Sequence, residues 1–243
     1  MRNAFINELI DAAEKNSNIV LVVGDLGYGV VEPFAKRFPK YFFNAGVAEQ
    51  NMMGFAAGLA SEGFHVFVYS IANFPTFRCA EQIRNDVDYH NLPVTIVTVG
   101  GGLSYGNLGY SHHAVQDYAL MRVMPNMLIA APGDPMEVRA CMRHIIKNPQ
   151  PSYLRLGKAG EPCIHSKVPV VSPGQWLLIR NGKKKKTYLT TGSTLVLVDQ
   201  LLSNNPEMQN WTLNSMPLWS MSTKEAQVRQ VEPFLTVVTV ENH

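Results

Sequence analysis

Hydrophobic positions follow two alternating patterns along the first two thirds of the chain. Phe5, Leu9 and Ala12 recur at helical spacing and predict an amphipathic helix at the N-terminus. The next apolar run, IVLVVGD at 19–25, is short and β-branched, which is typical of a strand buried on both faces. The alternation then repeats. The expected helices are 48–62, 76–90, 116–124 and 135–147, and the expected strands are HVFVYS, VTIVTVG, MLIAAPG and SYLRL.

Strands separated by helices predict an α/β fold with a mainly parallel sheet and helices on both faces. We expect this first unit to occupy residues 1–158. Residues 159–174 are rich in Gly, Pro and Ser and are predicted to be a linker. Residues 175–243 predict a small α/β C-terminal unit, with a charged helix at 223–231 and a strand in FLTVVTV. The sequence stops directly after that strand, so we expect an incomplete unit, either naturally short or cut.

Composition narrows the class of protein. Hydrophobic residues make up 46% of the chain and charged residues only 16%, which indicates apolar surface covered by another subunit. A net charge of +2 gives no sign of nucleic-acid or membrane binding. The lysine run at 183–186 follows Asn181 and Gly182, which favours a solvated turn over a phosphate or nucleic-acid patch.

The cellular compartment follows from three further features. The three cysteines, an odd number without C-x-x-C spacing, favour free thiols in a reducing environment. The N-terminal segment carries acids in its first turns, unlike a signal peptide. No apolar run approaches the roughly 20 residues that a membrane helix needs. We therefore expect a cytoplasmic protein that contacts no membrane.

One acid, Glu49, stands at the start of the predicted helix 48–62. A carboxylate there complements the helix dipole, which would be a purely structural role. The helix also contains Gly54 and Gly58, and each glycine inside a helix costs about 0.5–1 kcal/mol relative to alanine. Close approach of another backbone would explain that cost. An acid at the edge of such a contact is partly desolvated and suited to proton exchange.

Other candidate side chains follow the predicted strands, where α/β folds bind ligands. His112 and His113 come after a loop with five glycines between 100 and 109. A substrate contact and a surface or capping role are both open for them. A metal site is rejected, because carboxylate or cysteine partners at ligand spacing are missing. Core packing and a surface ion pair would explain Phe74, Phe77 and Arg78 after HVFVYS without any further role.

Four segments together resemble the transketolases and 1-deoxyxylulose-5-phosphate synthase. GVAEQNMMGFAAGLA is similar to the segment with the family's catalytic glutamate, and YSIANFPTFRCAEQIRNDV to the aromatic segment after it. GYSHHAVQDYALMRVMPNMLIAAPGDPMEV resembles the family's histidine segment, and PSYLRLGK the strand with a substrate-phosphate arginine. Order and spacing hold from about residue 4 to residue 158. TVENH at the end resembles the start of the transketolase C-terminal domain.

The resemblance implies thiamine diphosphate as the cofactor. That cofactor becomes a nucleophile when its thiazolium ring loses a proton to its own amino group, and a carboxylate hydrogen-bonded to the pyrimidine N1′ promotes this loss. By resemblance Glu49 is the carboxylate. Phe74 and Phe77 would be the rings that stack on the aminopyrimidine, and Arg78 would belong to the same cofactor site.

The resemblance also implies substrate contacts. His112 would hydrogen-bond the ketose donor in the catalytic site, His113 would contact substrate beside it, and Arg155 would bind substrate phosphate. The sequence departs from the family at two positions that normally touch the donor's hydroxyl groups. Leu108 replaces an aspartate, and Gly100 falls near the place of a histidine. The identity of the donor sugar is therefore open.

The resemblance implies a split enzyme. The family binds the diphosphate and Mg²⁺ through a G-D-G motif, which this chain lacks, so we expect no metal ligands here and a partner chain that carries them. The expected assembly is a homodimer or an α2β2 complex that transfers a two-carbon ketol unit between sugars or sugar phosphates. Two alternatives stay open: the beta subunit of a 2-oxo-acid dehydrogenase, and a non-catalytic stabilising or regulatory partner.

Overall fold

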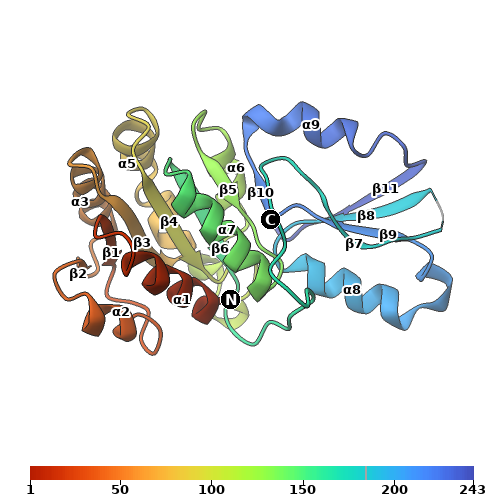
Figure 1. Ribbon diagram of the computed structural model, residues 1–243, viewed down its shortest axis with the longest axis horizontal. Coiled ribbons are helices and arrows are strands. Elements are labelled where there is room, and N and C mark those ends of the chain that lie inside the picture. The colour runs from red at the N-terminus through yellow and green to blue at the C-terminus, as the bar shows by residue number, and fades with distance from the viewer. Residues whose placement is uncertain (184) are drawn as a thin grey trace.

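The computed structural model describes residues 1–183 and 185–243, so Lys184 of the predicted lysine turn lies outside the described residues. The described chain forms two β-sheets side by side, with the C-terminus between them (Figure 1). The large sheet has the strand order β10-β5-β6-β4-β3-β1-β2, and only β10 runs antiparallel to its neighbour. Its strands are β1 Ile19–Val23, β2 Phe42–Asn44, β3 His65–Ile71, β4 Val94–Val99, β5 Leu128–Ala130, β6 Ser152–Leu156 and β10 Leu218–Trp219.

Helices cover both faces of the large sheet. In β1, Leu21 packs into the core that α1 and α7 cover, whereas Val20 and Val22 pack into the core under α3. Helices α1 and α7 lie side by side on one face (Figure 1). The mainly parallel α/β fold expected from the sequence is thereby confirmed. The helices of this unit are α1 Arg2–Ala13, α2 Glu32–Arg37, α3 Glu49–Ser61, α4 Asn73–Phe77, α5 Ala80–Gln82, α6 Asp117–Arg122 and α7 Pro135–Lys147.

The predicted helix 76–90 is three shorter helices in the structure. Helices α4 and α5 are followed by a π-helix, η1 Ile83–Asp88. The break falls at Cys79, whose thiol is fully buried in the core and whose backbone leaves the helical region with φ −113° and ψ 14°. The loop after β4 holds two 3₁₀ turns, η2 Gly106–Leu108 and η3 Tyr110–His112. All three cysteines are free thiols, as expected.

The small sheet has the order β11-β8-β9-β7, in which β7 is antiparallel to β9. Helix α8 packs against it through Leu195, Val198 and Leu202. This agrees with a small α/β C-terminal unit. Its elements are β7 Leu177–Arg180, β8 Lys186–Thr190, α8 Thr194–Asn204, η4 Pro206–Met208, β9 Thr212–Ser215, η5 Met221–Thr223, α9 Lys224–Arg229 and β11 Thr236–Val240.

The C-terminal segment also contributes to the large sheet. Strand β10 leaves the small unit and pairs antiparallel with β5, with Leu218 opposite Ala130 and Trp219 opposite Ile129. The segment WTLNSMPL is therefore divided between the two sheets, which the sequence pattern did not predict. None of the helices in the described ranges is long and apolar enough to cross a membrane.

Candidate active site

Glu49 is the first residue of α3 and is almost completely buried. Ala48 precedes it at the N-cap position and makes no side-chain cap hydrogen bond. Glu49 is the acidic residue of the first helical turn. The Glu49 side chain is 5% exposed, and its Oε1 accepts a hydrogen bond from Nη1 of Arg78 at 2.8 Å. Within the described ranges this is its only hydrogen-bond partner. A cavity of about 450 Å³ lies against Glu49 and is lined by Val47, Ala48, Gln50, Asn51 and Arg78.

A row of aromatic rings runs away from this ion pair. The guanidinium carbon of Arg78 lies 4.4 Å from the ring centroid of Phe74. Phe74 meets His112 edge-to-face at 5.2 Å, and His112 meets Tyr105 at 6.1 Å. The Nζ atom of Lys158 lies 5.3 Å from the Tyr105 ring centroid. We call Phe74, His112 and Tyr105 the ring row, and it has a cation at each end.

The two histidines have different surroundings. The Nδ1 atom of His112 lies 3.0 Å from the Ser111 hydroxyl oxygen, and the ring takes its place in the ring row. His113 donates from Nε2 to the Gly106 carbonyl at 2.9 Å and so holds the segment after the glycine loop against the loop. Asn73 holds this loop to α4, because its Nδ2 donates to the Ser111 carbonyl at 2.8 Å. The structure thus brings Glu49, Phe74 and His112 into one cluster.

Two members of the cluster, Tyr105 and Lys158, were not predicted. Gly100 makes room for the Tyr105 ring, because a Cβ at Gly100 would lie 2.0 Å from that ring. Lys158 is exposed just beyond the end of β6, which is the signal that could have identified it. Phe77 lies outside the ring row, with 47% of its surface exposed.

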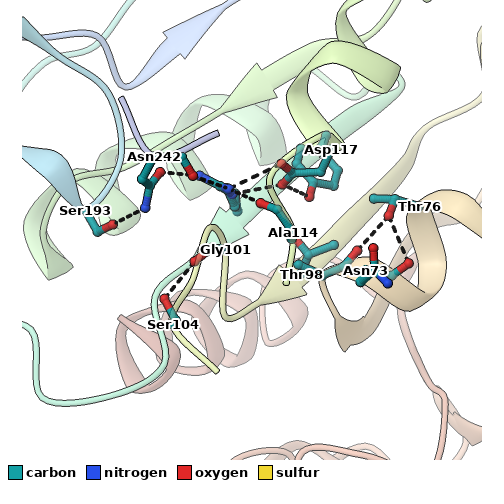
Figure 2. Close-up of polar contacts among 12 residues, drawn as sticks. Asn73, Thr76, Thr98, Gly101, Ser104, Ala114, Asp117, Ser193 and Asn242 are labelled. Atoms are coloured by element: carbon teal, nitrogen blue, oxygen red, sulfur yellow. Dashed lines mark hydrogen bonds and ion pairs between the residues drawn. The ribbon is translucent and has the colours of Figure 1, made fainter. Parts of the chain in front are cut away.

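Arg155 lies in a different environment from the one expected. Its guanidinium is buried and donates from Nη1 to Oδ1 of Asn242 at 2.7 Å and from Nη2 to the Ala114 carbonyl. Its Nε lies 2.8 Å from Oδ2 of Asp117. Figure 2 shows Asp117, Ala114 and Asn242 converging on one point, with Asn242 also bonded to Ser193. The guanidinium of Arg155 is therefore occupied inside the chain and takes no part in the ring row.

Comparison with known families identifies the fold around this cluster. The family model described as "Transketolase, pyrimidine binding domain" matches residues 1–160. The chain belongs to that transketolase family. The match covers well over half of the chain and includes the whole of the large sheet except β10. The resemblance drawn from the motifs is thereby confirmed.

Individual relatives of this transketolase-family chain are, by their names, parts of split enzymes. The "Putative transketolase C-terminal section" of Methanocaldococcus jannaschii is 42% identical over 166 residues, which are 68% of this chain and 52% of that protein. The chain thus spans about half the length of that relative. One of the subunits of an apulose-4-phosphate transketolase from Actinobacillus succinogenes is 31% identical over 244 residues, covering 100% of this chain and 78% of that protein.

Solved structures that superpose on this chain are also described as transketolases. A structure described as "Split gene transketolase, inactive beta4 tetramer" superposes with a TM-score of 0.84 at 33% identity. The superposition covers 100% of this chain and 79% of that one. A transketolase from Campylobacter jejuni, at 21% identity and a TM-score of 0.79, shares the fold over 98% of this chain and 39% of its own.

Proposed function

We propose that this chain is one subunit of a two-chain transketolase and supplies the aminopyrimidine half of a thiamine diphosphate site. The observation that carries the proposal is Glu49, a buried carboxylate that opens on a cavity of about 450 Å³ and has an aromatic ring, Phe74, close to its ion pair. A carboxylate with one replaceable partner can accept a hydrogen bond from a pyrimidine nitrogen. The names of the relatives, a C-terminal section and a separate transketolase subunit, support the split.

Each residue of the cofactor half has a defined part in this proposal. Thiamine diphosphate, when bound, supplies the carbon nucleophile that carries the two-carbon unit. Glu49 holds and exchanges a proton at N1′ of the pyrimidine. Phe74 offers its ring face to the pyrimidine, and the exposed Phe77 covers the outer side. Arg78 belongs to this half through its bond to Glu49.

The rest of the ring row, with Lys158 at its far end, would form the part of the site that binds the substrate. In this proposal His112, which contacts Phe74, would hydrogen-bond a hydroxyl or carbonyl oxygen of the ketose donor, and His113 would hold the loop beside it through its bond to Gly106. At the far end, Lys158 is the exposed cation that can pair with a phosphate. Lys158 suits that role better than Arg155, because the Arg155 guanidinium already pairs with Asp117 and Asn242.

The partner chain would supply the diphosphate and Mg²⁺ site, because this chain has no G-D-G motif. The outer face of α3 is suited to assembly. A Cβ at Gly54 or Gly58 would meet nothing within 4 Å, so this stripe is smooth and open. Phe55 and Phe43 stand beside it, 39% and 36% exposed, and contact each other edge-to-face at 5.2 Å. A homodimer or an α2β2 assembly would cover these rings.

The test is Glu49→Gln in the complex with the partner chain. The amide is nearly isosteric, so folding and assembly should be kept. Exchange of the cofactor's C2 proton, followed by NMR in deuterated solvent, should slow by about 10²–10⁴-fold, the usual range for loss of a general acid–base group. Glu81→Gln, on the exposed side of α5, is the matched control and should exchange as the wild type does.

Two results would contradict the proposal. Exchange in Glu49→Gln within a few-fold of the wild type would reduce Glu49 to a helix-start acid and favour a non-catalytic subunit. Turnover of a 2-oxo acid with reduction of a lipoyl group, without ketol transfer from any sugar, would make the chain a dehydrogenase beta subunit.

A further inference from the structure

Arg78 makes by itself both of the contacts that the aminopyrimidine is proposed to make. Its Nη1 donates to Oε1 of Glu49 at 2.8 Å, and its guanidinium carbon lies 4.4 Å from the Phe74 ring centroid. A guanidinium is planar, carries hydrogen-bond donors at its edge and stacks on aromatic rings. In these respects it matches an aminopyrimidine ring.

We propose that Arg78 is an internal occupant of the aminopyrimidine position, which the cofactor has to displace. This inference rests on the proposed function of Glu49. Arg78 is the hydrogen-bond partner of the Glu49 carboxylate, in the position that N1′ of the pyrimidine would take. The pair also keeps the Glu49 side chain turned toward the cavity. Arg78 is thus a positioning residue that acts through Glu49.

The surroundings of Arg78 permit its release. Its side chain is 51% exposed, so the guanidinium regains water when the entering pyrimidine replaces it as the partner of Glu49. Arg78 caps the end of α4, directly before the break at Cys79, so its side chain lies at the rim of the cluster. Glu49, in contrast, is 5% exposed and keeps its place.

Displacement has a measurable consequence for binding. When the binding-competent state is only a fraction of the population, the apparent dissociation constant rises by the inverse of that fraction. Because the Arg78 half of the pair is 51% exposed, we take the weak range of surface pairs, in which the fraction free of the Arg78 contact is roughly one half to one fifth. Removing the guanidinium should therefore tighten cofactor binding roughly two- to fivefold. A direct cofactor contact by Arg78 would give the opposite sign.

The first experiment measures thiamine diphosphate binding by the complex of this chain with its partner, using Arg78→Gln and calorimetry. We expect affinity to rise roughly two- to fivefold and stopped-flow association to become faster. Arg84→Gln is the matched control, since Arg84 is an exposed arginine bonded only to its neighbour Asn85 in the described structure. Unchanged or weaker binding by Arg78→Gln, with wild-type binding intact, would overturn the inference and leave the proposed function standing.

The second experiment needs no cofactor. Urea unfolding of the 243-residue chain is measured for Arg78→Gln, Glu49→Gln and the double variant. If the two side chains pair, the loss in urea midpoint for the double variant is smaller than the sum of the two single losses. Additive losses would show that the pair does not form in the free chain and would overturn the inference. A wild-type complex that binds no thiamine diphosphate would instead overturn the proposed function and this inference with it.

Discussion

The Nε atom of Arg155 lies 2.8 Å from Oδ2 of Asp117, and these side chains are 3% and 0% exposed. Asn242 accepts from Nη1 of the same guanidinium at 2.7 Å, and the Tyr118 ring centroid lies 4.3 Å from its carbon. Arg155 therefore connects β6, α6 and the C-terminal residues of the chain. Its position explains why a strand otherwise made of uncharged side chains carries a charge.

Arg155→Ala should destabilise the fold by about 3–5 kcal/mol, because it leaves the Asp117 carboxylate buried without its counter-ion. Urea unfolding of the free chain measures the loss. Arg229→Ala is the control: Arg229 pairs with Glu225 on the surface at 3.3 Å, and its loss should cost less than about 1 kcal/mol. If Arg155→Ala keeps wild-type stability and selectively weakens phosphorylated substrates, Arg155 is a substrate contact after all.

Lys158→Ala should weaken phosphorylated substrates more than unphosphorylated ones. A hydrogen bond to a charged group contributes roughly 1.5–3 kcal/mol, and the difference should appear in the ratio of kcat/KM values for the two substrate types. Lys158→Arg keeps the charge and should restore much of the ratio. Stability should change little, because the side chain is exposed. Equal losses on both substrate types would remove Lys158 from the phosphate site.

Gly58→Leu should affect association between chains and the stability of the free chain in opposite directions. A Cβ at Gly58 meets nothing within 4 Å, so the free chain should tolerate the leucine and gain up to about 1 kcal/mol in helix propensity. Overpacking of a contact surface costs about 1–3 kcal/mol, so association with the partner or a second copy should weaken. Analytical ultracentrifugation and urea unfolding measure the two effects. Glu225→Leu on the exposed face of α9 should change neither, and unchanged assembly in Gly58→Leu would place α3 outside the interface.

The stability of the fold should depend on pH because the carboxyl group of Glu137 is buried. Burial raises the pKa of Glu137 to about 7 from 4.5, although the Gly133 N–H and His165 oppose the shift. Burial lowers the pKa of His165, but its bond to Asp134 and the nearby Glu137 outweigh this, so the pKa is raised overall. In both cases the folded chain holds a proton that the unfolded chain has released.

The free energy of unfolding should therefore fall as pH rises from 4.5 to about 7. The slope from Glu137 alone should reach at most about 1.4 kcal/mol per pH unit. His165 adds the same sign above its ordinary pKa of 6.5. Urea unfolding across this window measures the slope, and Glu137→Gln, which keeps a neutral hydrogen-bonding side chain, should remove most of it. A wild-type slope that survives in Glu137→Gln would assign the titration to other groups.

Long elements with a local burial pattern could be predicted from the sequence. Helix 135–147 has the expected bounds because Asp134 caps it, accepting from the Glu137 N–H at 2.7 Å, and a proline opens it. Strands such as β1 are buried over their whole length, so their apolar runs were sufficient evidence. The break at Cys79 coincides with burial of its thiol in the core under α3, which no local pattern records.

The sequence could predict those site residues that directly follow parallel strands, because the carboxyl ends of these strands lie together. Glu49, Phe74 and His112 follow different strands and meet because parallel strands bring their carboxyl ends together. Arg155 could not be judged in this way. It shares a face of β6 with Tyr153, toward α6, and its partners Asp117 and Asn242 come from distant parts of the chain. Tyr105 was hidden within a loop whose glycines indicated mobility and whose ring contact at Gly100 depends on the fold.

Strand β10 is synthesised after all the other strands of the large sheet and pairs with β5 at its edge. Most of the large sheet has emerged by Leu156, yet β5 keeps one open edge until Leu218 and Trp219 arrive to bond with Ala130 and Ile129. An open strand edge is a template for pairing with other chains. Until β10 pairs with β5, this edge is therefore available to other chains, and β10 covers it. The C-terminal unit thus closes one sheet edge of the domain before it.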